Sequence, residues 1–168
     1  AKKINKAVFP GEQGGPLMHV IAAKAVAFKE ALEPSFVDYQ KQVVKNAKVI
    51  AETFSGLGYK VISKTTDNHL VLIDVKSKLG ITGKLAEETL YKVNITINKN
   101  SIPFDKEKPA YTSGIRLGSP AMTTKGFKEK EFKQISLWIH EVLSDPFNEV
   151  LLEEVRNKVI ELTKEFKK

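Results

Sequence analysis

The chain has 168 residues, 42% of them hydrophobic, and this length and composition predict one compact core in a single domain or slightly more. It contains no cysteine, which excludes disulfide bonds and thiolate metal sites and agrees with a reducing, cytoplasmic setting. The net charge of +7 permits weak contact with nucleic acid, but lysines alternate with glutamates as on a solvated helix face, so nucleic acid is not expected as a main partner. No apolar run reaches membrane-spanning length, so a membrane is not expected as a partner either.

The N-terminal region is predicted to be a loop followed by two helices. Residues 9–15 are rich in glycine and indicate an irregular loop, and Pro16 suits the first position of a helix because its missing N–H would have no intrahelical partner there. Apolar residues at helical spacing predict a helix over 17–32. Pro34 ends that helix, and a second helix is predicted from Phe36 to Gly56 or Gly58, where glycine allows a left-handed end.

The pattern then changes to residues that suit a pleated sheet. The predicted elements from here on are strands over 59–62, 69–74, 94–98 and 114–118, a helix over 82–93 capped by Thr82, a long loop over 98–113, and helices over 127–142 and 152–166. The long loop is a candidate functional segment, because long loops inside compact domains are often functional. Together these elements predict an α/β fold in which a small, mostly antiparallel sheet is covered by helices.

Arg116 is one of only two arginines in a chain that otherwise uses lysine for positive charge. It lies in the predicted strand 114–118, which has a glycine at each end. A planar guanidinium can hold a carboxylate through two parallel hydrogen bonds, which a lysine ammonium cannot reproduce, so this residue indicates a site for a small-molecule carboxylate. The alternative is a salt bridge between Arg116 and a nearby aspartate or glutamate.

Gly14 and Gly15 directly precede the predicted proline-led helix. Exposed backbone N–H groups and the helix dipole both favour an anion such as phosphate at this kind of position. The alternative is a tight turn that needs the positive φ that glycine allows.

The three histidines, His19, His69 and His140, have no spacing that favours a metal ion, and no metal site is expected. His69 follows Asp67 at the start of a predicted strand and is interpreted as a structural hydrogen-bonding residue. Asp67 and Asp74 are given no catalytic role.

Four motifs occur in order along the chain: residues 8–19 (VFPGEQGGPLMH), 66–70 (TDNHL), 98–103 (NKNSIP) and 112–121 (TSGIRLGSPA). Together they closely resemble the serine hydroxymethyltransferase family, and the likeness extends over the whole chain. The resemblance implies a fold-type I pyridoxal phosphate enzyme of the cytoplasm. Such an enzyme interconverts serine and glycine, transfers a one-carbon unit to tetrahydrofolate, and forms a homodimer or higher homo-oligomer.

The resemblance also implies roles for individual residues. Arg116 matches the arginine that holds the carboxylate of the amino-acid substrate. Gly14 and Gly15 match glycines that the family presents to the cofactor phosphate across a dimer interface. Asn100 matches an asparagine that contacts the pterin, and its amide can both donate and accept hydrogen bonds. The segment where the family contacts folate corresponds to Lys108, Pro109 and Ala110.

By resemblance, the chain is the C-terminal portion of such an enzyme, with residues 1–32 as the end of the large domain and 33–168 as the small domain and its linking helix. The family's Schiff-base lysine follows Thr-Thr-His and precedes Gly-Pro-Arg-Gly-Gly, and no such motif occurs here. Lys125 follows Met-Thr-Thr but lacks the histidine and the glycine-rich sequel. No catalytic residue is therefore expected in this chain, which is expected to be inactive by itself.

The sequence departs from the family pattern at two positions. Glu12 stands where many relatives carry a smaller or neutral residue, and Ala110 stands where an aromatic is often found.

Two other functions are alternatives to this interpretation. A stand-alone basic domain that binds nucleic acid or a protein would show salt-sensitive binding to random oligonucleotides. A related cofactor enzyme with another amino-acid substrate would have no use for a pterin contact at Asn100.

Overall fold

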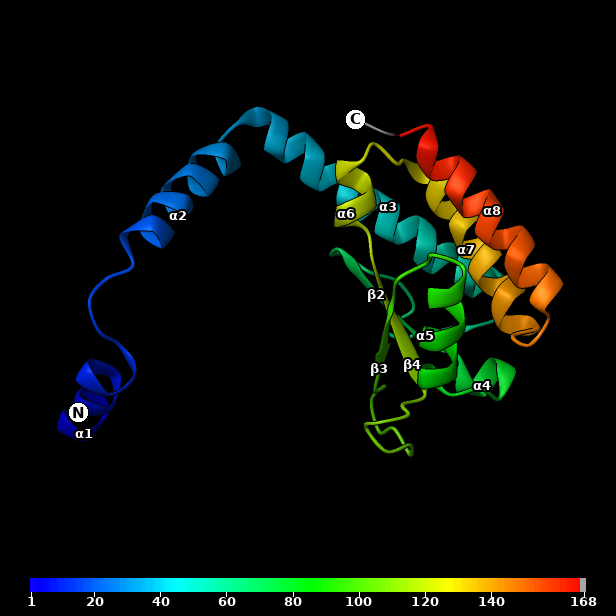
Figure 1. Ribbon diagram of the computed structural model, residues 1–168, viewed down its shortest axis with the longest axis horizontal. Helices are drawn as coiled ribbons and strands as arrows, with labels where there is room; N and C mark the ends of the chain where they lie inside the picture. The colour runs from blue at the N-terminus through cyan, green and yellow to red at the C-terminus, as the bar shows by residue number, and fades with distance from the viewer. Residues whose placement is uncertain (167–168) are drawn as a thin grey trace. The chain divides into compact units, whose positions relative to one another are not determined.

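The computed structural model describes residues 1–166, which form two compact units. The first unit is Ala1–Asp38, and the second begins at Tyr39. The second unit holds the sheet and the hydrophobic core, and it confirms the predicted α/β fold with a small antiparallel sheet and flanking helices (Figure 1). Among residues 1–166, no helix is long and apolar enough to cross a membrane.

The first unit is helical, and nearly all of its side chains are exposed. Its helical segments are α1 (Lys2–Lys6), a π-helical stretch (Ala7–Glu12) and α2 (Met18–Ala31). Non-helical backbone angles at Phe9 and Pro10 interrupt the π-helical stretch. The expectation that Pro16 opens the helix is wrong, because the next residue, Leu17, still has non-helical backbone angles and α2 starts only after it.

The second unit contains a four-stranded antiparallel sheet in the order β1-β2-β4-β3. The strands are β1 (Lys60–Val61), β2 (Leu70–Asp74), β3 (Asn98–Asn100) and β4 (Gly114–Gly118). In the central pair, Ile73 lies opposite Ile115 and Leu72 lies opposite Arg116. Successive side chains of a strand point to opposite faces, so Arg116 is on the face opposite to the two isoleucines.

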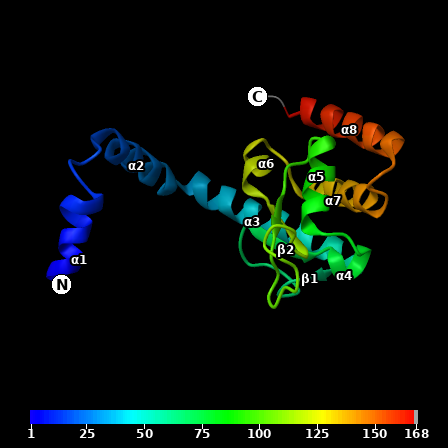
Figure 2. The same cartoon turned by 60° about the horizontal axis from the view of Figure 1, so that its bottom comes forward.

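Helices cover the face of the sheet that carries the isoleucines. The helices of this unit are α3 (Pro34–Gly56, which starts in the first unit), α4 (Lys76–Leu79), α5 (Gly83–Lys92), α6 (Pro120–Thr124), α7 (Glu129–Ser144) and α8 (Glu149–Lys164). α5 contacts β3, β4 and α7, and α7 contacts α8. Figure 1 shows α5 beside β4 and α7 beside α8, and Figure 2 shows the same helices from another side. The largest fully buried side chains include Phe54, Ile73, Leu90, Ile115 and Ile139.

Several predicted elements are confirmed and one is displaced. Thr82 caps α5 as predicted, because its hydroxyl accepts a hydrogen bond from the N–H of Leu85 (3.2 Å). The strand predicted over 94–98 is wrong for 94–97, which has no strand partner. Ile95 and Ile97 are nevertheless buried, so their alternation reflects packing against the core without strand pairing. The short helices α4 and α6 were not predicted.

A buried polar network joins α3 to the chain directly after β4. Asn46 is fully buried, and its Nδ2 donates to the Thr123 hydroxyl (2.8 Å) and to the Phe127 carbonyl (3.1 Å). The Ser119 hydroxyl donates to the carbonyl of Val43 (2.7 Å). Because buried polar groups need partners, these bonds fix α6 and the end of β4 against α3.

Candidate substrate-binding site

The candidate site is centred on Arg116, in the middle of β4. Its side chain is exposed, whereas those of Ile115 and Leu117 are buried against the helices. Within residues 1–166, no hydrogen bond or ion pair engages the Arg116 guanidinium, and the other arginine, Arg156, pairs with Glu153 (3.6 Å). The salt-bridge alternative for Arg116 is therefore not found in the part of the chain that is described.

Two ladder partners share the open face with Arg116. Leu72 of β2 and Asn98 of β3 lie directly opposite it, and direct partners in an antiparallel pair point to the same side. Neither side chain is acidic, so the donors of the guanidinium remain available to an added carboxylate. Sequence reasoning missed Asn98, because its position beside Arg116 depends on strand register.

Asn100 lies at the end of β3, on the same face as Arg116. Its direct ladder partner is Gly114, two residues before Arg116. Its Nδ2 donates to the carbonyl of Ser101 (2.7 Å), and its side-chain oxygen has no hydrogen-bond partner among residues 1–166. The fold thus brings these two predicted site residues together on adjacent strands.

The other predicted folate contacts lie in the loop between β3 and β4. The backbone turns at Lys108, whose carbonyl accepts hydrogen bonds from the N–H groups of Tyr111 (2.8 Å) and Thr112 (3.0 Å). The side chain of Lys84 on α5 lies over the Tyr111 ring, with its Nζ 5.6 Å from the ring centroid. The side chains of the predicted segment are all exposed: Lys108, Pro109 and Ala110.

Asp105 organises this loop. One carboxylate oxygen accepts from the N–H of Ile102 (3.2 Å) and of Ser113 (2.9 Å), and the other accepts from the N–H of Glu107 (2.9 Å) and the hydroxyl of Ser113 (2.6 Å). Burial works to raise the pKa of Asp105, but the hydrogen bonds from Ser113, Glu107 and Ile102 outweigh it and lower the pKa from 3.8 to about 2. The carboxylate therefore stays ionised at neutral pH.

Gly14 and Gly15 lie in the first unit, in the non-helical stretch before α2. Both are exposed, and no heavy atom lies within 4 Å of a Cβ built on either residue. Neither has positive φ, so the alternative of a turn that requires glycine for its backbone angles is contradicted. α2 also begins without a side-chain cap. The N–H of Val20 donates to the carbonyl of Leu17 (3.0 Å), so within residues 1–166 the N–H groups of Met18 and His19 are the ones open to an anion.

The histidines make structural contacts or lie at the surface. The ring Nδ1 of His140 lies 2.9 Å from the hydroxyl of Tyr59, and burial raises the pKa of Tyr59 to about 12. His69 is exposed, and only its backbone carbonyl is engaged, by the N–H of Ser119 (3.1 Å). The interpretation of the His69 side chain as a hydrogen-bonding group is therefore wrong within residues 1–166. Among the same residues, no group of three or more His, Cys, Asp or Glu could hold a metal ion.

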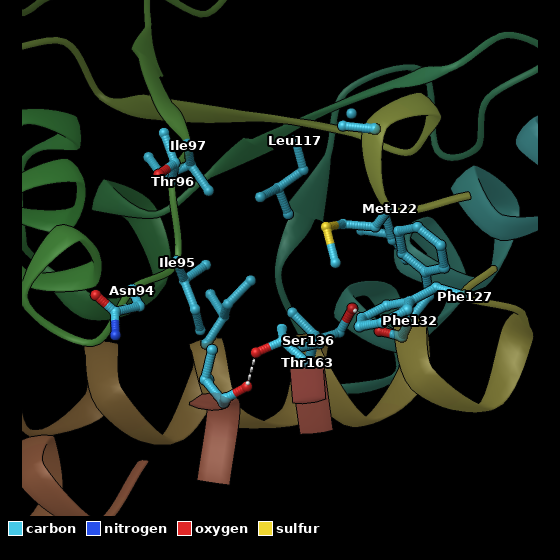
Figure 3. Close-up of a pocket in the computed structure, with 16 residues that line it drawn as sticks. Asn94, Ile95, Thr96, Ile97, Leu117, Met122, Phe127, Phe132, Ser136 and Thr163 are labelled. Atoms are coloured by element: carbon cyan, nitrogen blue, oxygen red, sulfur yellow. Dashed lines mark hydrogen bonds between the residues drawn. The ribbon is translucent and has the colours of Figure 1, made fainter. Parts of the chain in front are cut away.

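A cavity of about 290 Å³ lies on the helix-covered side of the sheet, the side toward which Leu117 points (Figure 3). Leu117, Met122 and Phe132 contribute apolar side chains to its wall, and Ser136 and Thr163 contribute hydroxyls. Both hydroxyls donate to backbone carbonyls of their own helices. None of the predicted site residues lines this cavity.

The fold is an α/β domain whose open sheet face presents Arg116, exposed and without a partner among residues 1–166. The sequence model of the family described as serine hydroxymethyltransferase matches residues 1–139, and the chain belongs to this family. Serine hydroxymethyltransferases of Phytoplasma mali, Dichelobacter nodosus and Nitrosococcus oceani are 60%, 58% and 54% identical to it over 165 residues. These alignments cover 98% of this chain but 39% of each relative, so the chain spans about two fifths of the length of these curated relatives.

Proposed function

We propose that this chain is the substrate-orienting and folate-contacting part of a pyridoxal phosphate-dependent serine hydroxymethyltransferase of the cytoplasm. In this proposal the whole enzyme interconverts serine and glycine and passes a one-carbon unit to tetrahydrofolate. The observation that carries the proposal is the guanidinium of Arg116, which is exposed on the open sheet face and unpaired within residues 1–166. Membership of the family supports the same reaction.

Arg116 binds the carboxylate of serine or glycine through two parallel hydrogen bonds. Its backbone is fixed on both sides by β2 and β3, so the carboxylate is held at a defined place relative to the sheet. Asn98 and Asn100 add amide groups to the same face, and Asn100 has an unused acceptor for the pterin. In this arrangement the chain binds and orients the two substrates.

The cofactor phosphate binds at Gly14 and Gly15. Their exposed backbone and the uncapped first turn of α2 fit an anion, and a side chain at either glycine would stand in the way of a close approach. When bound, pyridoxal phosphate supplies the electron sink for cleavage of the bond between Cα and Cβ of serine. The resemblance implies that these glycines serve the cofactor of a second subunit, so the assembled enzyme is a homodimer or higher homo-oligomer.

This chain contributes no catalytic residue in the proposal, and by itself it is inactive. The lysine motif that carries the cofactor in the family is absent from residues 1–168. Cleavage therefore requires the part of the relatives that this chain does not match, which is the larger share of their length.

A complementation experiment tests the proposed function. The chain is mixed with pyridoxal phosphate, first alone and then with the N-terminal remainder of the Dichelobacter nodosus relative, a mixture called here the complemented protein. We expect a visible absorbance band of bound cofactor, together with serine cleavage that depends on tetrahydrofolate, only in the complemented protein. Activity of the chain alone would contradict the predicted inactivity, and a complemented protein without serine cleavage would contradict the function.

A further inference from the structure

The loop over residues 101–113 has little apolar packing of its own. Only Thr112 and Ser113, at its end, are buried, and Phe104 at its tip is fully exposed. The backbone of Phe104 and of Thr112 also has positive φ, which residues other than glycine rarely adopt. A loop of this kind keeps one conformation only if specific polar contacts hold it.

The contacts divide between the two halves of the loop. At its end, the carbonyls of Thr112 and Tyr111 accept hydrogen bonds from the N–H groups of Gly83 and Lys84, both 2.9 Å. At its front, the carboxylate of Asp105 accepts hydrogen bonds from the N–H groups of Ile102 and Glu107 and also from the N–H of Ser113, near the end of the loop. An ion pair between Glu107 and Lys76 adds a partly exposed contact to α4.

Asp105 therefore bridges the two strands of the candidate site. Ile102 is two residues after Asn100, and Ser113 is three residues before Arg116. The packing over β4 is close, since a Cβ built on Gly114 would lie 2.6 Å from Cγ2 of Ile102 and 2.9 Å from the carbonyl oxygen of Asn100. A shift of the front half of the loop would thus be transmitted directly to the chain that carries both site residues.

We propose that Asp105 is a positioning residue for both substrates, because its carboxylate holds the backbone that carries Asn100 and the segment 108–110 in a fixed place relative to Arg116. Asp105 touches neither substrate and acts through the N–H groups that it binds. This inference rests on the proposed function. The hydrogen bonds lower the pKa of Asp105 to about 2, so its carboxylate is ionised and able to accept all four bonds at neutral pH.

The test compares Asp105→Asn with Glu107→Gln. Both variants remove one negative charge from the same loop, but only Asp105 accepts hydrogen bonds from the loop backbone. Asparagine has the shape of aspartate but turns an NH₂ group toward N–H donors. Ser113→Ala, which removes only the 2.6 Å hydroxyl bond, is a milder variant if Asp105→Asn folds poorly.

The first measurement is amide hydrogen exchange in the 168-residue chain. In Asp105→Asn we expect the N–H groups of Ile102, Glu107 and Ser113 to exchange on the order of tenfold faster, because hydrogen bonds to an ionised acceptor are lost. Glu107→Gln should leave these amides within about twofold of the unsubstituted chain, since its broken ion pair is partly exposed. Unchanged exchange in Asp105→Asn would overturn the bridge itself.

The second measurement is steady-state kinetics in the complemented protein. We expect Asp105→Asn to raise the KM for serine and for tetrahydrofolate by roughly tenfold each, with a smaller change in kcat, while Glu107→Gln stays near the unsubstituted values. Ser113→Ala should shift both KM values in the same direction by a smaller factor. Faster exchange with unchanged KM values would make Asp105 merely structural and overturn the inference, whereas loss of serine cleavage in the unsubstituted protein would overturn the proposed function.

Discussion

Arg116 combines a fixed backbone with a side chain that has no partner within residues 1–166. The strand holds its Cα between Leu72 and Asn98, and the guanidinium faces away from the core. A binding group on a regular strand is positioned more reproducibly than one on a loop. The identity of the residue then matters for geometry as well as charge, because only arginine offers two parallel donors.

We predict that Arg116→Ala nearly abolishes serine cleavage in the complemented protein and that Arg116→Lys restores little of it. Loss of the carboxylate clamp costs several kcal/mol of transition-state stabilisation, about a thousandfold in kcat/KM for serine. Arg156→Lys is the matched control, since Arg156 is the only other arginine and forms an exposed pair on α8. Near-normal turnover by Arg116→Lys would contradict the argument from the two parallel donors.

Gly83, the first residue of α5, lies against the start of β4. A Cβ built on it would be 2.2 Å from the hydroxyl oxygen of Thr112 and 2.3 Å from the carbonyl oxygen of Gly114. We predict that Gly83→Ala lowers the free energy of unfolding by about 2 kcal/mol, because the backbone must move apart to admit the methyl group. Urea unfolding measures this loss. The control is Gly56→Ala, at a site with no atom within 4 Å of the added Cβ, and an equal loss in both variants would contradict the steric argument.

At the scale of elements, the helices and strands that depend on local sequence were predicted correctly. The capping hydroxyl of Thr82 and the helical spacing of the residues after it predicted α5, and Gly114 and Gly118 are the two ends of β4, as predicted. The strand over 94–98 failed because Ile95 and Ile97 alternate through burial alone, and the paired strand starts only at Asn98. A single sequence does not distinguish these two causes of alternation.

The candidate site was predictable by residue type and by resemblance but not by arrangement. Arg116 is conspicuous among lysines, and Asn100 lies in a recognisable motif. Asn98 joins them only through strand register, and Asp105 acts through four hydrogen bonds that span up to eight residues of sequence. Register and loop contacts are tertiary properties, so the sequence alone carries no direct signal of them.

Tyr59 and His140 connect the turn before β1 to α7. The tyrosine hydroxyl lies 2.9 Å from Nδ1 of His140, and the Tyr59 ring packs edge-on against Phe54 at 5.1 Å between centroids. Burial raises the pKa of this hydroxyl from 10.0 to about 12. Between these two pH values the unfolded state loses the proton while the folded state keeps it, so this group's contribution to stability is complete below pH 10 and is lost as the pH rises toward 12.

We predict that Tyr59→Phe is less stable than the unsubstituted chain by about 1 kcal/mol at pH 8, because a hydrogen bond is lost. The difference should shrink by about 2 kcal/mol, and so reverse, as the pH approaches 12, since phenylalanine has no proton to lose. Urea unfolding at several pH values measures the difference, and Tyr91→Phe is the control because Tyr91 is exposed. A constant difference between Tyr59→Phe and the unsubstituted chain over this range would contradict the raised pKa.

At the scale of the whole molecule, the two units differ in how much of their apolar side-chain surface is buried. The second unit buries one continuous core, whereas the first leaves large apolar side chains exposed on every side of α2, including Val20, Ile21, Val26 and Phe28. A helix that is apolar all round is normally buried within a larger body. This exposed apolar surface supports the proposal that residues 1–32 are the end of a large domain, with 33–168 as the small domain and its linking helix.

We predict that the 168-residue chain self-associates at micromolar concentration and that residues 33–168 alone remain monomeric and unfold cooperatively. The apolar surface of α2 drives the association, because burying it against a second copy removes it from water. Sedimentation velocity measures the two species, and Phe28→Glu should weaken association without shortening the chain. α3 starts at Pro34 and stays whole in the shorter chain, so its core residues from Val43 to Phe54 keep their partners. A monomeric 168-residue chain, or a shorter chain that fails to unfold cooperatively, would contradict the proposed division into domains.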